Sequence, residues 1–457
     1  MKKRRIYPIL ISILIGSLWT GSFFHPAYGV TEPPAIMGST ACVMDLATGT
    51  VIYDKDMHGV RPPASTTKMM TALLVLENLP LDTQVIIDSE VVNTGGNTLA
   101  FKDGEIISVE DLMYGMLLYS ANDAAVALAK QVAGSVPKFA EMMNQRAQEL
   151  GAMHTTFQNP HGLTEEGHVS TAYDLALIAR AAMENEVFRE MVKTDKYTIT
   201  ANFLSGEREI FTTNLLLADV ETMVTIGGIQ RPVRYEDCIG VKTGFTLAAG
   251  NCLVAAAARE ETEFLSVVLN SGELERFSDS IQLLDWSFDN YRNLKAVQKG
   301  EPVGTVRVKG GSQLKPEVAG EEDSILLLPN DAADSVVSTQ VHLDEGLVAP
   351  LSAGAVVGQI QVLEGDRVSK TVNAVLLEDV PEGTFLTAIG IPDSVGKPLI
   401  KIGIGLIALL VVGAVALLLV RMNVKRKKQR LLQEKAREIA ARRLAEERDK
   451  ENRNWRF

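Results

Sequence analysis

The stretch that decides the fold reads Pro63-Ala64-Ser65-Thr66-Thr67-Lys68-Met69-Met70. It opens an apolar run that stops at Pro80, which we interpret as a buried helix beginning at Ser65. Positions three apart share a helix face, so the Ser65 hydroxyl and the Lys68 amine would meet on the first turn. A desolvated lysine can take the proton of a serine, so the pair predicts nucleophilic catalysis. A helix-capping serine beside a lysine that lies along the helix would explain the same residues.

Two further polar motifs lie in apolar surroundings. Ser108 begins a second predicted helix, which breaks at Tyr119-Ser120-Ala121-Asn122 before an alanine-rich helix that Asp123 would cap. This polar wedge between helices is unusual, although a plain helix connector would have the same appearance. The third motif, Lys242-Thr243-Gly244, lies in residues 239–245, which have the pattern of a strand.

The order of the predicted elements indicates the architecture of residues 30–295. Two strands form an early hairpin, a helical block follows, and three strands and a helix complete this part of the chain. This order predicts one sheet backed by helices. Residues 203–234 have no clear pattern and are expected to be irregular. The predicted strands are 41–46, 51–53, 239–245, 252–258 and 264–269, and the last helix is 276–288.

The pattern changes at about residue 296. Short alternating segments lie between glycine-rich turns as far as residue 385, with little sign of helix. Residues 296–385 are therefore expected to form a separate, small all-β domain.

Both ends of the chain carry membrane-related signals. Residues 1–29 combine four basic residues, an apolar core and small residues before the end, which predicts a signal peptide. After a linker, 386–401, the uncharged apolar run 402–420 is long enough to cross a bilayer as one transmembrane helix. The basic segment 421–457 follows at once and predicts a cytoplasmic tail, leaving the preceding domains outside.

Charge and cysteine content narrow the function further. The net charge is −12, yet the first five residues carry +4 and residues 421–457 carry +8, so the remainder carries −24. Such an acidic body argues against nucleic acid as a partner.

The three cysteines, Cys42, Cys238 and Cys252, lack metal-ligand spacing. We interpret them as small buried hydrophobes, with a disulfide between the last two left open. His154 and His161 are expected to be structural.

The three motifs together are much more specific than any one alone. Ser65-x-x-Lys68, Ser120-x-Asn122 and Lys242-Thr243-Gly244 occur in the order found in penicillin-binding proteins and class A β-lactamases. Asn159-Pro160-His161-Gly162-Leu163 and the stretch from Ser170 to Ala176 add support. Residues 35–385 resemble the low-molecular-weight penicillin-binding proteins, the serine D-alanyl-D-alanine carboxypeptidases of peptidase family S11.

The resemblance implies a fold and an activity. The fold would be the α/β (α+β) fold of serine β-lactamases and penicillin-binding-protein transpeptidases, an antiparallel sheet with helices. The activity would be removal of the terminal D-alanine from peptidoglycan stem peptides at the outer face of the membrane. No metal or cofactor is implied, and β-lactam antibiotics would act as inhibitors.

The resemblance also assigns roles to residues. Ser65 would be the nucleophile, Lys68 the base and Ser120 a proton relay to the leaving amine. Substrate binding would fall to Asn122, Lys242, Thr243, Gly244 and Phe245. The relatives carry histidine or tyrosine at the position of Phe245, so a polar side-chain contact is lost while the backbone N–H remains.

Three alternatives differ in what they require. A β-lactamase needs an added carboxylate for fast deacylation, and no Glu-x-x-Leu-Asn phrase lies between Asn122 and Lys242. A non-catalytic peptidoglycan-binding protein is disfavoured because all three motifs are intact. A D,D-endopeptidase acting on cross-links stays open at the level of sequence.

Overall fold

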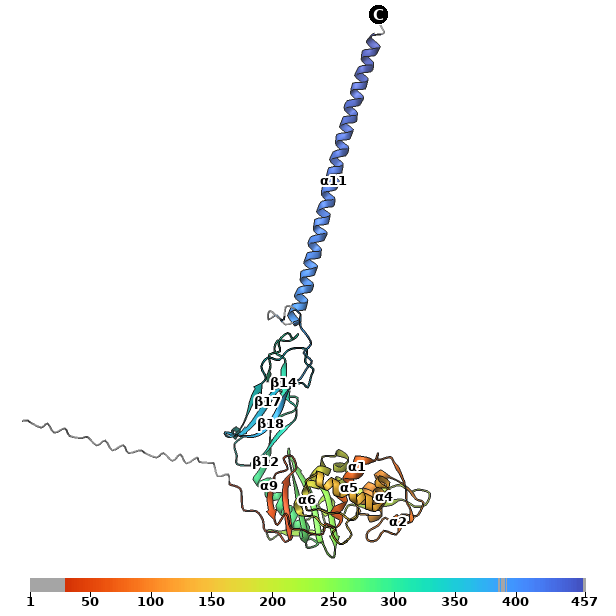
Figure 1. Cartoon of the computed structure of the whole chain (residues 1–457), viewed down its shortest axis with the longest axis vertical. Coiled ribbons are helices and arrows are strands. Elements are labelled where there is room, and N and C mark those ends of the chain that lie inside the picture. The colour runs from red at the N-terminus through yellow and green to blue at the C-terminus, as the bar shows by residue number, and fades with distance from the viewer. Residues whose placement is uncertain (1–28, 385–386, 388–390, 392, 455–457) are drawn as a thin grey trace, which may run out of the picture. The chain divides into compact units, whose positions relative to one another are not determined.

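The computed structural model describes residues 29–384, 387, 391 and 393–454 (Figure 1). The predicted signal peptide, 1–29, lies outside the described residues apart from Gly29. The described chain divides into two compact units. The first runs to Lys295 and also includes Ile325–Val336, and the second comprises Ala296–Ser324 and the residues from Val337 onward.

The first unit contains the elements expected to carry the site. Its helices are η1 (Ala64–Thr67), α1 (Lys68–Asn78), α2 (Ser89–Val92), α3 (Val109–Leu117), α4 (Asn122–Ala133), α5 (Val136–Glu149), α6 (Ala172–Met183), α7 (Glu186–Lys193), α8 (Leu215–Ala218) and α9 (Glu275–Asn290). Its strands include β1 (Thr40–Asp45), β2 (Val51–Lys55), β3 (Gln84–Ile86), β4 (Ile106–Ser108), β5 (Lys196–Ile199), β6 (Arg208–Phe211), β7 (Met223–Ile226), β8 (Ile229–Pro232), β9 (Cys238–Thr246), β10 (Gly250–Arg259) and β11 (Thr262–Ser271).

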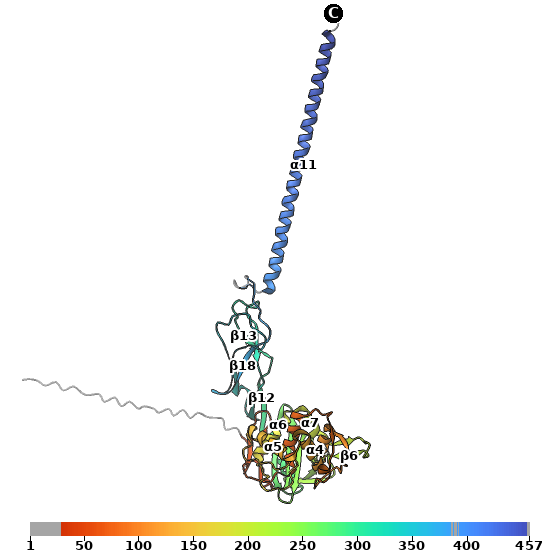
Figure 2. The same cartoon turned by 45° about the vertical axis from the view of Figure 1, so that its right-hand side comes forward.

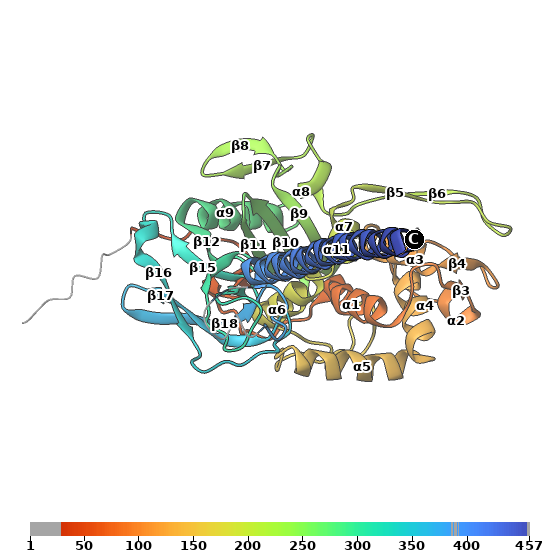
Figure 3. The same cartoon turned by 90° about the horizontal axis from the view of Figure 1, so that it is seen from above.

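An antiparallel sheet in the order β2-β1-β11-β10-β9 forms the centre of this unit. Both faces are buried, because successive residues of β1 enter different cores. Cys42 and Met44 pack in the core that contains the helices from α1 to α7, whereas Ala41 and Val43 pack against α9. Figure 3 shows α9 and α6 on opposite sides of strands β10 and β11. The predicted sheet backed by helices is confirmed.

The motif helix begins later than predicted. Ser65 lies in the 3₁₀ turn η1, and the α-helix starts at Lys68. A 3₁₀ helix has about three residues per turn, so positions i and i+3 eclipse each other. Ser65 and Lys68 therefore still share a face, although the expected helix start at Ser65 was wrong.

The second motif occupies a tight bend between α3 and α4. Ser120 has a φ of +65°, in the left-handed region, which turns the chain sharply before Asn122 begins α4. The prediction that Asp123 caps this helix was wrong, because Ala121 holds the N-cap position. The Asp123 carboxylate instead accepts hydrogen bonds from the backbone of Leu99, at 2.9 and 3.1 Å.

Residues 203–234 are more regular than expected. Strand β6 pairs with β5 across the loop 200–207, and β7 pairs with β8 across Gly227-Gly228. These strands are four residues long and partly exposed, so their sequences lack the alternation that marks a half-buried strand.

The second unit has its own antiparallel sheet (Figure 2). Its strands follow the order β13-β14-β18-β17-β16 around a small valine-rich core that includes Val318 and Val357. Their bounds are β13 (Pro302–Thr305), β14 (Glu317–Gly320), β16 (Val337–Leu343), β17 (Val356–Glu364) and β18 (Arg367–Leu376).

One part of the expected all-β domain belongs elsewhere. Ile325–Val336 clusters with the first unit, because β15 (Ser324–Pro329) pairs with β12 (Tyr291–Val297), which directly follows α9. Asn330 strengthens the attachment, since its N–H donates to Asn290 O at 2.9 Å. Within the predicted range 296–385, residues 325–336 thus make their contacts with the first unit, and alternation alone cannot tell which sheet a strand joins.

The C-terminal region is one continuous helix, α11 (Asp393–Asn454) (Figure 1). Of the expected linker, 386–401, the part from Asp393 onward is helical, and Pro398 lies inside this helix, where its missing N–H removes one backbone hydrogen bond. Among the described residues, this is the helix that is long and apolar enough to be a candidate membrane span, and it contains the predicted span 402–420.

Gly162 offers a test of how tightly the nucleophile turn is held. Its φ is +88°, and a Cβ there would lie 1.8 Å from the carbonyl oxygen of Ala64. We expect Gly162→Ala to destabilise the protein by more than about 2 kcal/mol, since a backbone clash adds to the strain of a left-handed alanine.

Gly151→Ala is the matched control for thermal unfolding measurements. Gly151 has a φ of +81°, but its Cβ would meet Leu177 at an ordinary 3.8 Å. Only the strain of about 1 kcal/mol should remain. Equal losses of unfolding midpoint in the two variants would contradict the close packing of Gly162 on the turn.

Candidate active site

Lys68 lies at the centre of the candidate site. Its Nζ is 3.0 Å from Ser65 Oγ, 2.7 Å from Asn122 Oδ1 and 2.8 Å from the carbonyl oxygen of His161. The η1 turn supplies the first partner, the start of α4 the second and the loop 159–163 the third. Three segments distant in sequence therefore meet at one amine.

The surroundings of Lys68 disfavour its positive charge. The side chain is fully buried. Burial and the neighbouring cation of Lys242 hold the pKa of Lys68 well below its usual range, against a smaller opposing effect of Asp123. The capping-serine interpretation of the first motif is unsupported, because Ser65 makes no helix-capping hydrogen bond in either η1 or α1.

Asn122 is held from two sides, so its orientation is fixed. Its side-chain Nδ2 donates to Gly95 O at 2.8 Å, and its backbone N–H donates to Asn97 O at 2.7 Å. Gly96 makes this approach feasible, since a Cβ there would lie 2.5 Å from Asn122 Nδ2. The loop 93–105 is thus part of the support for the site.

Strand β9 places the third motif against the nucleophile turn. A Cβ on Gly244 would lie 3.2 Å from the backbone nitrogen of Ser65, so glycine allows the two backbones to approach closely. Lys242 is 1% exposed, and burial together with Arg276 lowers its pKa to about 7. Thr243 shares a 2.6 Å hydrogen bond with the hydroxyl of Thr213.

Two polar residues at this edge were missed at the level of sequence. Arg276 of α9 donates from Nη1 to Gly244 O at 3.3 Å and places a second cation beside Lys242. Thr213 follows β6 and reaches Thr243 from a stretch expected to be irregular. Neither lies in a recognisable motif, so only the folded chain connects them with the site.

Phe245 has an exposed side chain, unlike the buried side chains of Asn122, Lys242 and Thr243 that were also assigned to substrate binding. Its side chain is 56% exposed on β9, beyond the buried Thr243. It directly follows Gly244 on the strand and pairs with Asn251 of β10. The side chain itself makes no contribution to the polar contacts described above.

Two histidine rings and three cysteines of this unit lie in largely buried positions. Burial lowers the pKa of His161 to about 3 and that of His168 to about 4, so both rings are neutral. The Nδ1 of His168 accepts from Gln158 N at 3.0 Å, which leaves its Nε2–H to donate to Thr67 Oγ1 at 2.9 Å. All three cysteines are free and buried, and no group of metal-ligating residues occurs within the described chain.

Comparisons with known proteins agree with this arrangement. A family model described as D-alanyl-D-alanine carboxypeptidase, Peptidase_S11, matches residues 28–273, and one described as Penicillin-binding protein 5, C-terminal domain, matches residues 291–382. The D-alanyl-D-alanine carboxypeptidase DacF of Bacillus subtilis is 29% identical over 392 residues, which cover 84% of this chain and 96% of DacF.

Two further relatives extend the same result. The D-alanyl-D-alanine carboxypeptidase DacD of Escherichia coli is 30% identical over 401 residues, covering 85% of this chain and 97% of DacD. The crystal structure of penicillin binding protein 5 from Haemophilus influenzae matches with a TM-score of 0.59 and 26% identity, covering 77% of this chain and all of that chain.

The fold and the motif set define a penicillin-binding-protein type of transpeptidase fold followed by a small all-β domain. The chain belongs to the D-alanyl-D-alanine carboxypeptidase family, Peptidase_S11, and is a serine-type enzyme of that class. None of the comparisons reported above favours a β-lactamase, an endopeptidase or a non-catalytic protein.

The coupling of Arg276 to Lys242 can be measured directly. A cation beside an amine disfavours its protonated form, so Arg276→Gln should raise the pKa of Lys242 above about 7. NMR titration of ¹⁵N-labelled lysine side chains would follow the change. Arg276→Lys keeps the charge and should leave the titration of Lys242 near that of the wild type. A Lys242 that titrates identically in all three proteins would contradict the coupling.

Proposed function

We propose that this carboxypeptidase removes the terminal D-alanine of peptidoglycan stem peptides through an ester on Ser65. The observation that carries the proposal is the set of three partners around Lys68 Nζ. A neutral amine has two N–H donors and one lone pair. The donors match the oxygens of Asn122 and His161, which directs the lone pair toward the Ser65 hydroxyl.

Acylation follows from that arrangement. Lys68 takes the proton as Ser65 Oγ attacks the carbonyl carbon of the penultimate residue. The oxygen of that carbonyl becomes an anion, and the backbone N–H groups of Ser65 and Phe245 are proposed to stabilise it. The carbon–nitrogen bond then breaks, and the proton passes from Lys68 through Ser120 to the departing amine of D-alanine.

Recognition of a free C-terminal carboxylate is assigned to the edge of β9. This edge carries two basic groups, from Lys242 and Arg276, and the hydroxyl of Thr243. Basic groups and a hydroxyl can donate charge-assisted hydrogen bonds to a carboxylate. Asn122 would hold the substrate amide, while Gly244 lets the strand approach it. Water then attacks the ester carbonyl while Lys68 takes its proton, the bond to Ser65 Oγ breaks as that proton passes to Oγ, and the shortened peptide leaves.

The same proposal extends to β-lactam antibiotics as inhibitors. The lactam amide takes the place of the scissile bond, and the ring keeps the leaving group attached after acylation. Because the sequence contains no added deacylating carboxylate phrase, the ester on Ser65 should persist.

Substitution of the nucleophile and of the base tests the proposal. Ser65→Ala should give no covalent penicilloyl adduct by mass spectrometry. Lys68→Ala should acylate more slowly by about 10²–10⁴-fold, the usual contribution of a positioned proton acceptor. The rates would be measured with a fluorescent penicillin.

Lys138→Ala is the matched control, because Lys138 is an exposed lysine of α5 in the same unit. It should acylate at the wild-type rate. An adduct on a residue other than Ser65, or near-normal acylation of Lys68→Ala, would show that the roles are wrongly assigned.

We further propose that the protein is a single-pass membrane protein with its catalytic unit outside the cytoplasm. The apolar part of α11 supports an anchor, and the cations from Arg421 to Arg430 favour a cytoplasmic C-terminus. In the chain, the small all-β domain comes between the catalytic unit and this helix.

Protease protection tests this topology. Protease added to intact cells should digest the catalytic unit and spare an epitope placed after Phe457, because the membrane shields the tail. After permeabilisation the epitope should disappear as well. Its loss from intact cells would reverse the proposed orientation.

A further inference from the structure

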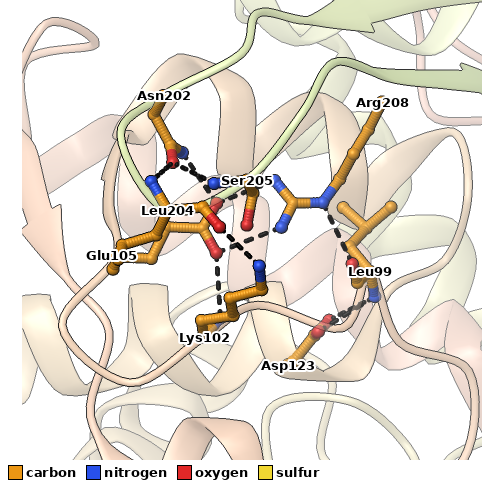
Figure 4. Close-up of polar contacts among 8 residues, drawn as sticks. All are labelled: Leu99, Lys102, Glu105, Asp123, Asn202, Leu204, Ser205 and Arg208. Atoms are coloured by element: carbon orange, nitrogen blue, oxygen red, sulfur yellow. Dashed lines mark hydrogen bonds and ion pairs between the residues drawn. The ribbon is translucent and has the colours of Figure 1, made fainter.

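A buried carboxylate, that of Glu105, lies outside the candidate site, and the catalytic roles proposed above do not use it. The carboxylate of Glu105 is fully buried and accepts four hydrogen bonds. Arg208 Nη1 and Asn202 Nδ2 donate to one oxygen at 2.8 and 2.7 Å, and Arg208 Nη2 and Lys102 N donate to the other at 3.0 and 2.8 Å (Figure 4). Despite the opposing effect of burial, the bonds from Arg208 and Asn202 hold the pKa of Glu105 at about 2.

The third guanidinium nitrogen of Arg208, Nε, does not contact Glu105 but a backbone carbonyl. Its Nε donates to the carbonyl oxygen of Leu99 at 3.1 Å, and its guanidinium lies 4.9 Å from the ring centre of Phe101. The planar guanidinium thus fixes the position of Leu99 relative to Glu105, which a single-nitrogen cation could not do.

Leu99 is where this ion pair meets the second motif. Its carbonyl accepts from Arg208, while its N–H donates to both oxygens of Asp123. Figure 4 shows Leu99 between the side chains of Arg208 and Asp123. Asp123 directly follows Asn122, whose Oδ1 receives the hydrogen bond from Lys68. A continuous set of contacts therefore leads from Arg208 to the proposed base.

Beyond its C-terminal end, the strand that carries Arg208 leads into Thr213, which contacts the third motif. Five residues after Arg208, Thr213 donates from its backbone N–H to Leu118 O at 3.1 Å and bonds the hydroxyl of Thr243. Leu118 ends α3 just before Tyr119 and Ser120. The segment from β6 to Thr213 is therefore tied to both substrate-facing motifs.

We propose that the Arg208–Glu105 pair is a positioning pair for the carboxypeptidase reaction, acting through Leu99 on the orientation of Asn122. The proposal rests on the roles proposed above for Lys68 and Asn122. Neither member of the pair touches the reacting atoms. Their effect is to keep the loop 93–105 closed on the start of α4, so that Asn122 Oδ1 stays aligned with Lys68 Nζ.

Separating positioning from simple stabilisation requires a variant that keeps the charge. Removing either partner outright would leave a buried charge unpaired and lower stability severely. Arg208→Lys keeps a cation beside Glu105, but one nitrogen cannot bridge both carboxylate oxygens and Leu99 O. Glu105→Gln is the second variant, since it keeps the size of the side chain and weakens the guanidinium contacts.

Arg189→Lys is the matched control. Arg189 of α7 also bonds a carboxylate, Glu263 at 2.5 Å, and a backbone carbonyl, Met183 O at 3.3 Å. It contacts none of the three motifs through these bonds. The full-length protein in detergent would be used for all variants, with thermal unfolding measured in parallel.

The readout is the acylation rate constant with a fluorescent penicillin, expressed per titratable Ser65, together with kcat and KM for a D-Ala-D-Ala peptide. Arg208→Lys and Glu105→Gln should each acylate at least about tenfold more slowly, since a misplacement of about 1 Å can cost about 10²-fold. The loss should fall on kcat more than on KM, and Arg189→Lys should match the wild type.

A double variant tests the route through Leu99. Asp123→Ala with Arg208→Lys should be no slower than the slower single variant, because both changes release the same residue. If the rate losses of the two single variants instead multiplied in the double variant, the route through Leu99 would be contradicted. Wild-type acylation rates in both Arg208→Lys and Glu105→Gln, with only a lower unfolding midpoint, would overturn the positioning role. Absence of a Ser65 adduct in the wild type would instead refute the proposed function itself.

Discussion

Burial of the Lys68 amine is the constraint on which the rest of the catalytic unit depends. A fully buried lysine is stable only if its hydrogen-bonding groups are satisfied, and here three separate segments supply the partners. Three segments therefore place a polar atom next to Lys68 Nζ. They are the 3₁₀ turn at Ser65, the start of α4 after the bend at Ser120, and the loop at Gly162. The central sheet holds these segments in place, since Gly244 of β9 lies directly against the turn.

The sequence was sufficient for the parts of this arrangement that are local. Ser65 and Lys68 share a face in either a 3₁₀ or an α-helix, so the wrong helix start did not affect their pairing. The order of strands and helices likewise predicted the sheet, because a hydrophobic hairpin and three late apolar strands have few other ways to bury both faces.

What the sequence could not supply were contacts between residues far apart in the chain that carry no motif. Arg276 and Thr213 reach β9 from elements whose local patterns say nothing of a site. Strand β15 has the same alternation as its neighbours, and only its pairing with β12 decides that it belongs to the first unit. Asp123 looked like a helix cap because its partner, Leu99, lies 24 residues earlier.

The buried ionisable groups of this unit differ in whether they have a partner of opposite charge. The paired carboxylate lies in the supporting loop, whereas the unpaired basic groups lie in the candidate site. Glu105 is matched by the fork of Arg208 and gains every hydrogen bond it can accept, which makes it rigid and inert. Lys68, Lys242 and Arg276 form no ion pair with a carboxylate among the described residues, and their pKa values are all lowered. Where such a group carries its charge without a carboxylate partner, as Arg276 does, it lowers the stability of the free protein. A ligand that carries its own carboxylate would relieve that cost, as expected for a member of a carboxypeptidase family, whose substrates end in a free carboxylate.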